Sequence, residues 1–459
     1  MSLEDKLYPL LRLYEAAPQP VKSVVGRAYR AIPPRLRHGR EYPRFQAEAS
    51  ASESWTPAEL SDYQLQAVRE SLLAAQQSAF YRERFQASAL DPDKLESLEQ
   101  LRDYPLLTKQ DLIVHREEMV NPRVPGSQKL YITTGGSSGV PVGFYLQKGV
   151  SRPKEQAYLE AQWSRRGYRV GDRVAVVRGM VTSSRAAGGI SYYDATRNWL
   201  VLSSYHLTPD RVGEYVQALN RFQPRHLHMY PSAALLLARL LEQTGSRLDF
   251  QPVSVLCGSE KLTPDAQAYL QKTFGAPVFH WYGHSERAVL AGQGRQSNLL
   301  HFWPGYGLVE FGAPNEEGFQ EVIGTTFHNH VMPLIRYRTG DYVRLAPPGT
   351  GEWLWPAVEA VAGREHEFLV SATGRQISLT AINMHDRIFD GLCAVQFYQA
   401  DPGHVQLRYQ PGPQWHTSQE AAIRDGLTRK LGDDFTLELL SVPEVEKTSA
   451  GKHKWLVKG

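Results

Sequence analysis

The chain has 459 residues, of which 42% are hydrophobic and 22% are charged, and its formal net charge is +3. This length predicts a large domain with a smaller one, and the composition excludes a disordered or fibrous protein. The small net charge gives no indication of a nucleic-acid partner, and the only two cysteines, Cys257 and Cys393, exclude a disulfide framework.

The sequence gives no sign of export or of membrane insertion. The first residues, MSLEDKLYPLLRLYEAA, carry early acidic side chains and do not match a secretory signal. No run of about 18 apolar residues occurs, so we expect no transmembrane segment. Together with the few cysteines, these features favour a cytoplasmic protein.

Residues 22–44 form a basic segment with seven Lys or Arg residues and one acidic residue, Glu41. Such a segment has two interpretations. It is either a solvated basic helix and linker, or a patch for peripheral contact with an anionic membrane surface or an acidic partner.

The next predicted element is a helix over residues 56–85. Thr56 is a suitable N-cap, and Pro57 is well placed in the first turn. Farther along, the continuous apolar run at 174–177 predicts a short buried strand.

The middle of the chain continues this alternation of strands and helices. Residues 232–245 predict a helix with Ser232 as its cap and Gly245 at its end. Residues 253–260 predict a strand that runs into a Gly-Ser loop. The fold class is therefore α/β, with mixed, largely parallel β-sheets wrapped by helices.

The sequence changes character near Gly363. A hairpin that turns at Thr373-Gly374 is followed by a predicted helix from about Ala381, further strands and a helix within 418–432. This pattern predicts a small α+β domain. We therefore expect a large domain over 1–362 and a small one over 363–459.

One loop stands out, because residues 131–144 read YITTGGSSGVPVGF. A strand that enters a Gly/Ser/Thr loop exposes several N–H groups and hydroxyls, which suits a polyphosphate. The loop also matches G-x-S-x-G, which would make Ser137 the nucleophile of an acyl hydrolase. A flexible surface linker is the third interpretation, and the loop alone does not decide among them.

Four later segments favour the polyphosphate interpretation. They are Tyr282-Gly283-His284-Ser285-Glu286, Tyr337-Arg338-Thr339-Gly340-Asp341, Gly363-Arg364 and Lys447-Thr448-Ser449-Ala450-Gly451-Lys452. In this order, and after the Gly/Ser/Thr loop, they resemble the adenylate-forming superfamily, whose members activate a carboxylate with ATP. The chain is most similar to the phenylacetate–CoA ligase branch, and residues 363–386 look more like its CapK-like capsular-polysaccharide subgroup.

The resemblance implies a role for each matching residue. Glu286 would bind Mg²⁺, which prefers oxygen ligands, and Lys452 would be the catalytic residue of adenylation. The β- and γ-phosphates of ATP would be bound by Thr133, Thr134, Gly135, Gly136, Ser137, Ser138 and Gly139. Adenine and ribose would be bound by Gly258, Ser259, Glu260, Tyr282, Gly283, Ser285, Asp341 and Arg364. The 363–459 domain would be a mobile lid.

The acid is expected to bind between the helix that begins at Tyr230 and the 280–282 segment. Tyr230, His280 and Trp281 are the candidate lining residues, although aromatic side chains at these positions also suit a packed core.

Two departures from the family pattern bear on the second step. His366 stands where many relatives have an acidic residue near the hinge, and no basic cluster is evident for the 3′-phosphate of coenzyme A. The resemblance implies an acyl-adenylate whose acyl group passes to coenzyme A. The alternatives are transfer to an amine or hydroxyl of a sugar or small metabolite, the Ser137 hydrolase, and a non-catalytic partner in polysaccharide assembly.

Overall fold

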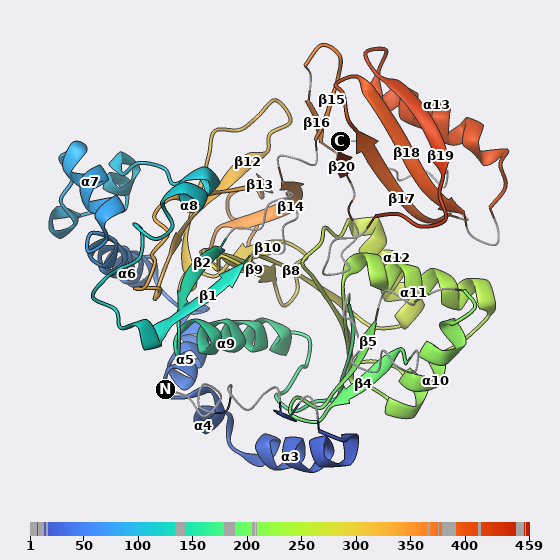
Figure 1. The fold of residues 1–459 in the computed structure, drawn as a ribbon, viewed down its shortest axis with the longest axis horizontal. Helices are drawn as coiled ribbons and strands as arrows, with labels where there is room; N and C mark the ends of the chain where they lie inside the picture. The colour runs from blue at the N-terminus through green and yellow to red at the C-terminus, as the bar shows by residue number, and fades with distance from the viewer. Residues whose placement is uncertain are drawn as a thin grey trace. The chain divides into compact units, whose positions relative to one another are not determined.

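The chain divides into two compact units in the computed structural model (Figure 1). Unit 1 comprises residues 1–172, 193–199 and 279–361, and unit 2 comprises residues 173–192, 200–278 and 362–459. The structure describes residues 7, 13–14, 17–133, 143–178, 189–203, 207, 209–364, 368–374, 376–378, 392–411, 415–446, 454 and 456–459. The domain boundary expected at residue 363 stays a prediction.

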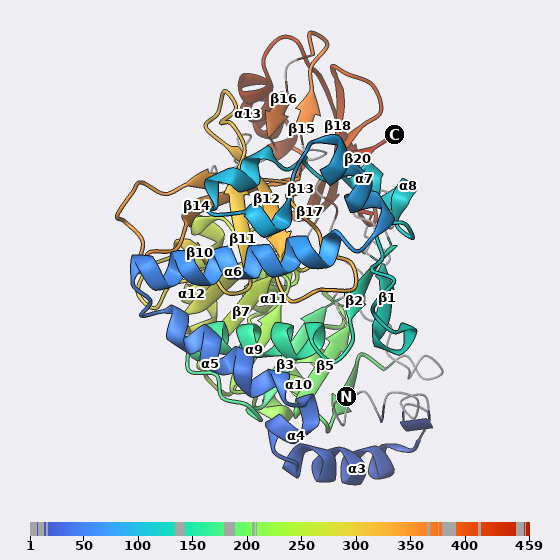
Figure 2. The same cartoon turned by 90° about the vertical axis from the view of Figure 1, so that its left-hand side faces the viewer.

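Helices make up most of the first part of unit 1. They are α3 (Gln19–Ala31), α4 (Pro34–His38), α5 (Glu41–Ser52), α6 (Pro57–Ala75), α7 (Ala79–Ala87), α8 (Lys109–His115) and α9 (Ser151–Ser164). Short 3₁₀ turns occur at Pro92–Lys94, Glu99–Asp103 and Gly126–Gln128. Helices α5 and α9 lie side by side (Figure 2). In the part of the chain that the structure describes, no helix combines the length and hydropathy needed to cross a membrane.

The single helix predicted over residues 56–85 is wrong in its length. Thr56 does cap α6, in a capping box with Glu59, but α6 ends at Ala75. Ser78 then caps α7 by accepting a hydrogen bond from the Tyr81 backbone N–H. The cap stops one helix and starts the next, although the helical sequence pattern continues through it.

The strands of unit 1 form a ribbon and a larger sheet. The ribbon pairs β1 (Lys129–Thr133) with β2 (Gly143–Gln147) in antiparallel fashion. The larger sheet has the order β11-β12-β13-β14-β10-β9-β8. Its strands are β8 (Val278–Gly283), β9 (Leu290–Gln293), β10 (Leu300–Phe302), β11 (Gly307–Phe311), β12 (Gln320–Thr326), β13 (Tyr337–Leu345) and β14 (Ala357–Arg364).

Unit 2 contains the predicted parallel sheet. Strands β6 (His226–Met229) and β7 (Ser254–Gly258) are parallel neighbours, and β6 is also parallel to β3 (Val174–Arg178). Strands β4 (Ser191–Asp194) and β5 (Trp199–Ser203) follow β3 in the sheet order. The helices of this part are α10 (Val212–Phe222), α11 (Pro231–Thr244) and α12 (Pro264–Phe274).

Helix α11 was predicted with one error. It ends at Gly245 in the left-handed conformation, as expected, but its N-cap is Tyr230 rather than Ser232. Pro231 occupies the first helical position, where its missing N–H costs no hydrogen bond, so the helix begins before the serine.

The C-terminal part of unit 2 is an α+β assembly, as predicted (Figure 1). The hairpin of β15 (Phe368–Val370) and β16 (Gln376–Ser378) includes Gly374, whose φ is +83°. A second sheet has the order β19-β18-β17-β20. Its strands are β17 (Leu392–Gln399), β18 (His404–Pro411), β19 (Thr436–Ser441) and β20 (Leu456–Lys458), accompanied by α13 (Gln419–Leu431). The helix expected from Ala381 lies outside the described residues.

Candidate active site

Glu286 lies in a tight turn directly after β8. The backbone N–H of Arg287 donates to the carbonyl of His284 at 3.0 Å, which closes the turn. The Glu286 residue is only 5% exposed, and its Oε1 accepts a hydrogen bond from the Tyr337 hydroxyl at 3.0 Å. Its Oε2 lies 3.2 Å from Nδ1 of His284. A tyrosine and a histidine therefore orient both oxygens of this buried carboxylate.

Two glycines, Gly307 and Gly324, pack closely against Ala288, which follows this turn. A Cβ on Gly307 would lie 1.9 Å from the carbonyl oxygen of Ala288, and a Cβ on Gly324 would lie 2.8 Å from its Cβ. Only glycine permits such close approach. Arg287 adds a hydrogen bond from Nη1 to the Ser151 carbonyl at 2.7 Å. These contacts fix the backbone on which Glu286 is carried.

The Tyr-Arg-Thr-Gly-Asp motif forms an irregular step in β13. Its register against β12 shifts between Glu321 and Ile323, so extra β13 residues bulge out of the ladder. Gly340 supplies the positive φ of +69°, and the Thr339 hydroxyl donates to the Val322 carbonyl at 2.8 Å. A bulge of this kind redirects side chains near functional sites.

This bulge accounts for the position of Asp341. The carboxylate is buried, and its Oδ2 accepts a hydrogen bond from the Tyr282 hydroxyl of β8 at 2.7 Å. Strands β13 and β8 have three strands between them in the sheet order. Strands lie about 4.8 Å apart, so a flat sheet would separate these two by about 19 Å, farther than the two side chains reach. The sheet of unit 1 therefore curls strongly and brings the two motifs together.

Strand geometry separates two of the residues expected around the acid. Successive side chains of a strand point to opposite faces, so His280 and Trp281 of β8 cannot face the same way. The Trp281 ring packs against Trp163, with centroids 5.6 Å apart, and against Phe279 at 6.3 Å. Tyr230 lies in unit 2, at the start of α11. All three stay predictions as acid-binding residues.

The loop expected beside adenine follows β7 in unit 2. Gly258 is the last residue of that strand, and Ser259 has a φ of +69°, which is rare for a residue with a side chain. Cys257 is buried next to this loop, and burial, with a smaller contribution from the negative charge of Glu260, raises its pKa. The loop thus leaves the carboxyl end of a parallel strand, where open α/β sheets commonly bind ligands.

Four more predicted site residues lie at strand ends or in the Glu286 turn, and seven lie outside the described residues. Thr133 and Arg364 are the last residues of β1 and β14, Gly283 ends β8, and Ser285 is exposed in the Glu286 turn. The residues outside the described part are Thr134, Gly135, Gly136, Ser137, Ser138, Gly139 and Lys452. The roles of all these residues stay predictions.

The donor set around Glu286 fits magnesium. Among the described residues, no three His, Cys, Asp or Glu side chains form a group that could hold a metal ion by themselves. Magnesium is commonly bound by one or two carboxylates together with substrate phosphates and water, so one oriented carboxylate suffices. Glu286 supplies such a carboxylate.

Sequence reasoning missed the residues that orient the carboxylates. Tyr337 stands in a recognised motif but was given no role, and the alternation of β13 gave no reason to connect it to Glu286. His284 also stands in a recognised motif, where it was considered as a contact of the acid or the phosphate and not of Glu286. Its Nε2 is buried without a hydrogen-bond partner among the described residues. Both could have been suspected from the motif positions alone.

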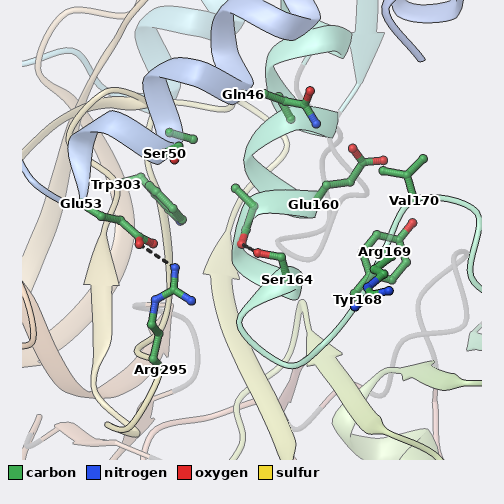
Figure 3. A pocket seen from close by; sticks show the side chains of 13 residues that line it. Gln46, Ser50, Glu53, Glu160, Ser164, Tyr168, Arg169, Val170, Arg295 and Trp303 are labelled. Carbon is green, nitrogen blue, oxygen red and sulfur yellow. Dashed lines mark hydrogen bonds and ion pairs between the residues drawn. The ribbon is translucent and has the colours of Figure 1, made fainter. Parts of the chain in front are cut away.

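A separate cavity of about 300 Å³ lies between α5 and α9 (Figure 3). Glu160 lines it, and burial raises the pKa of this carboxyl group. Glu53 and Arg295 form an ion pair at 2.8 Å on its wall. None of the residues predicted for the nucleotide, the metal or the acid lines this cavity, so it is distinct from the motif site.

Comparison with known proteins agrees with the motif order. No model of a known protein family matches the chain. CapK of Staphylococcus aureus is 26% identical over 298 residues, which are 64% of this chain and 65% of CapK. Phenylacetate-coenzyme A ligase of Escherichia coli (strain K12) is 28% identical over 330 residues, which are 68% of this chain and 72% of that enzyme. The matched part thus spans just under two thirds of CapK.

Among solved structures, the fold is similar to that of 2-hydroxyisobutyryl-CoA ligase in the postadenylation state in complex with R3-HIB-AMP. The TM-score is 0.69 at 18% identity, and the match covers 89% of this chain and 92% of the ligase. The chain is therefore similar in sequence to CapK and to phenylacetate-coenzyme A ligase, and similar in fold to 2-hydroxyisobutyryl-CoA ligase, which agrees with the resemblance that its motifs carry.

Proposed function

We propose that the protein joins a carboxylic acid to ATP as an acyl-adenylate, with release of pyrophosphate, and then transfers the acyl group to the thiol of coenzyme A. The observation that carries this proposal is the buried Glu286 carboxylate, which Tyr337 and His284 orient. The Tyr282–Asp341 pair in the same unit supports it. Both pairs come from the motifs that the family shares.

The residues of this site would divide the work between metal and nucleotide. Glu286 would hold Mg²⁺, and the ion would supply positive charge to the phosphates as negative charge shifts between them. Asp341, oriented by the Tyr282 hydroxyl, would accept hydrogen bonds from the ribose. Two anions must meet in this reaction, so positioning and charge neutralisation account for most of the catalysis.

Lys452 and the 133–139 loop would complete the adenylation site. The loop would surround the β- and γ-phosphates with N–H and hydroxyl donors, and Lys452 would stabilise the charge that develops between the carboxylate and the α-phosphate. In this proposal residues 363–459 act as a lid that brings Lys452 to the large domain over 1–362.

The acceptor is the part of the proposal with a rival. The names of two relatives, phenylacetate-coenzyme A ligase and 2-hydroxyisobutyryl-CoA ligase, support coenzyme A. The match to CapK supports the second candidate, an amine or hydroxyl acceptor in polysaccharide biosynthesis. The first half-reaction is common to both.

The test is pyrophosphate release in the presence of hydroxylamine, over a panel of aryl, fatty, hydroxy and amino acids with ATP and Mg²⁺. Hydroxylamine intercepts an acyl-adenylate, so the natural acceptor is not needed. We expect release with one class of acid, and we expect Lys452→Ala to abolish it. Lys454→Ala is the matched control, because Lys454 lies two residues away and contacts Glu446 at 3.6 Å.

Adding coenzyme A then decides the second step. A thioester product establishes the proposed acceptor, whereas adenylate formation without a thioester favours the amine or hydroxyl. Hydrolysis of esters without ATP, blocked by a fluorophosphonate, would instead support the Ser137 hydrolase. A failure to bind ATP would contradict the proposal as a whole.

A further inference from the structure

Helix α3 attaches to the rest of unit 1 by one narrow face. Gln19 Nε2 donates to the Tyr193 carbonyl at 3.1 Å, and Arg30 Nη1 donates to the Tyr193 hydroxyl at 3.2 Å. Between them, a Cβ on Gly26 would lie 2.5 Å from the Cβ of Ala195, so only glycine allows this approach. Positions 19, 26 and 30 lie on one side of a helix with 3.6 residues per turn.

The opposite face of α3 is apolar and points away from the protein. Val21, Val24 and Val25 are 49%, 63% and 48% exposed, and Ala28 is also exposed. Their spacing of i, i+3, i+4 and i+7 is that of an amphipathic helix, which usually buries such a stripe in a core. Here the stripe is turned outward by about half a turn from Gly26. Leu36 of α4 adds an apolar side chain that is 57% exposed.

Positive charge surrounds this stripe. Residues 19–40 contain six Lys or Arg residues and no Asp or Glu. Arg30 is used in the attachment, and Arg37 is buried, with its guanidinium 5.6 Å from the Tyr29 ring. Arg40 pairs with Glu41 at 3.2 Å, and the remaining three are Lys22, Arg27 and Arg35. On the helical wheel, positions 22 and 27 lie on the two sides of the valine stripe.

We propose that α3 lies flat on an anionic bilayer surface, with its valines at the headgroup boundary and Lys22, Arg27 and Arg35 against acidic headgroups. An outward apolar stripe flanked by Lys and Arg is the combination that binds such surfaces. A second copy of the chain fits less well, because it would bring two sets of like charges together. Nucleic acid fits less well too, because the stripe is aliphatic and offers no ring for a base to stack on.

Membrane association through α3 is independent of the ligase reaction proposed above. The exposed valines are few, so binding should be reversible and should need both the apolar contact and the charges. Each cation near an anionic surface is expected to contribute about five-fold in affinity. Added salt should weaken the binding, because it screens this part of the attraction.

The experiment is co-sedimentation of the full chain with vesicles of phosphatidylserine and phosphatidylcholine in equal parts, and with vesicles of phosphatidylcholine alone. We expect sedimentation with the anionic vesicles and little with the neutral ones. Val24→Ser with Val25→Ser should lower binding about ten-fold, and Arg27→Gln with Arg35→Gln about twenty-five-fold. Neither pair should change the thermal unfolding midpoint, because both lie on exposed surface.

Val114→Ser is the matched control, because Val114 is 57% exposed on another helix, α8. It should bind vesicles as the parent protein does. The proposal is overturned if the anionic vesicles fail to sediment the protein, or if both vesicle types bind it equally. It is also overturned if Val114→Ser weakens binding as much as the α3 substitutions, or if only an RNA or an acidic protein binds the α3 surface.

Discussion

Unit 1 buries charge in two regions that are built in opposite ways. Around the Glu286 turn, carboxylates are oriented by polar side chains, namely the hydroxyls of Tyr337 and Tyr282 and the imidazole of His284. Around α9, two buried cations, Lys154 and Arg165, are held by protein acceptors. This contrast separates charges that suit a ligand from charges that stabilise the fold.

The two cations are Lys154 of α9 and Arg165, the C-cap of that helix, and both point their donors at protein acceptors. Lys154 Nζ donates to the carbonyls of Tyr306 at 2.8 Å and Phe327 at 3.0 Å. The Arg165 guanidinium lies 4.3 Å from the rings of both Trp303 and Trp353. It also donates to Glu53 at 3.0 Å.

The partners of a buried charge indicate whether it suits a ligand or stabilises the fold. Carbonyls, aromatic faces and a carboxylate satisfy Lys154 and Arg165 internally, which is typical of structural charges. A tyrosine hydroxyl orients a carboxylate without cancelling its charge as a guanidinium would. Glu286 is therefore suited to meet a cation that arrives with a substrate, and Lys154 and Arg165 are suited to hold helices against strands.

The strongest test of this contrast is Glu286→Gln. It keeps the shape of the side chain and removes its negative charge, so adenylation should fall about a thousand-fold, equivalent to about 4 kcal/mol of activation free energy. Thermal unfolding should be unchanged or shifted slightly upward, because a buried charge is removed. The measurements are acid-dependent pyrophosphate release and the unfolding midpoint.

Glu160→Gln is the control for this substitution, because Glu160 is also 5% exposed and lies outside the motifs. It should leave pyrophosphate release unchanged. If both substitutions lowered the rate equally, buried carboxylates of unit 1 would matter for the fold and not for the chemistry.

Arg165→Met should produce the largest loss of stability. It leaves Glu53 with one fewer cationic partner and removes the guanidinium from between two indole rings, so the unfolding free energy should fall by about 3 kcal/mol. The rate per folded molecule should not change. Urea denaturation measures the first quantity and the pyrophosphate assay the second.

The neighbouring Arg166 offers the comparison for that variant. It is only half buried and donates to the carbonyls of Gly294 and Arg295, both at 3.0 Å. Arg166→Met should cost about 1 kcal/mol. An equal loss for the two variants would show that the ring stacking and the burial of Arg165 contribute nothing beyond ordinary hydrogen bonds.

Lys154 should give the fold a dependence on pH. Burial lowers the pKa of its amine to about 7, against the opposing charges of Glu155 and Glu48. Above that pH the unfolded chain still holds the proton that the folded protein has lost, so the unfolding free energy rises with pH until the unfolded pKa near 10.4. Between pH 7 and pH 9 the parent should gain about 2 kcal/mol relative to Lys154→Met.

Urea denaturation of both proteins at several pH values measures this gain. Lys94→Met serves as the control, because the Lys94 side chain is 83% exposed. Its stability curve should run parallel to that of the parent. Parallel curves for Lys154→Met as well would show that Lys154 keeps its charge when the protein folds.

Local patterns explain which parts of this molecule were predictable. The buried run of β3 and the helix α11 follow from the residues of each element alone, and the C-terminal hairpin follows from Gly374. The break between α6 and α7 was missed because the Ser78 cap interrupts an otherwise continuous helical pattern. Local periodicity contains no information about such a cap when apolar residues continue on both sides.

In the candidate site, too, some residues could be predicted from the sequence and others could not. Glu286 and Asp341 could be picked out from sequence, because both stand in short motifs. Lys154 could not be recognised, because its partners Tyr306 and Phe327 are more than 150 residues away in sequence. The bulge at Gly340 was equally hidden, since a glycine in a strand shows an irregularity but not its register.

The smallest effect predicted on the rate separates the proposed metal half of the site from the proposed nucleotide half. Tyr337→Phe removes the hydroxyl that orients Glu286, and Tyr282→Phe removes the hydroxyl that orients Asp341. Each loses one hydrogen bond to a carboxylate, so each should slow adenylation about ten-fold, or about 1.4 kcal/mol. Raised Mg²⁺ should partly restore the Tyr337 variant, whereas the Tyr282 variant should show a raised KM for ATP at any Mg²⁺ concentration.

The two phenylalanine variants match each other in size, burial and bond lost, so each is the control for the other. Opposite responses would mean that the two carboxylates serve different ligands although the curled sheet carries both. Identical responses would mean that the two pairs act as one structural unit. The contrast between ligand-binding and structural charge would then fail at the site itself, and the buried carboxylates would belong with Lys154 and Arg165.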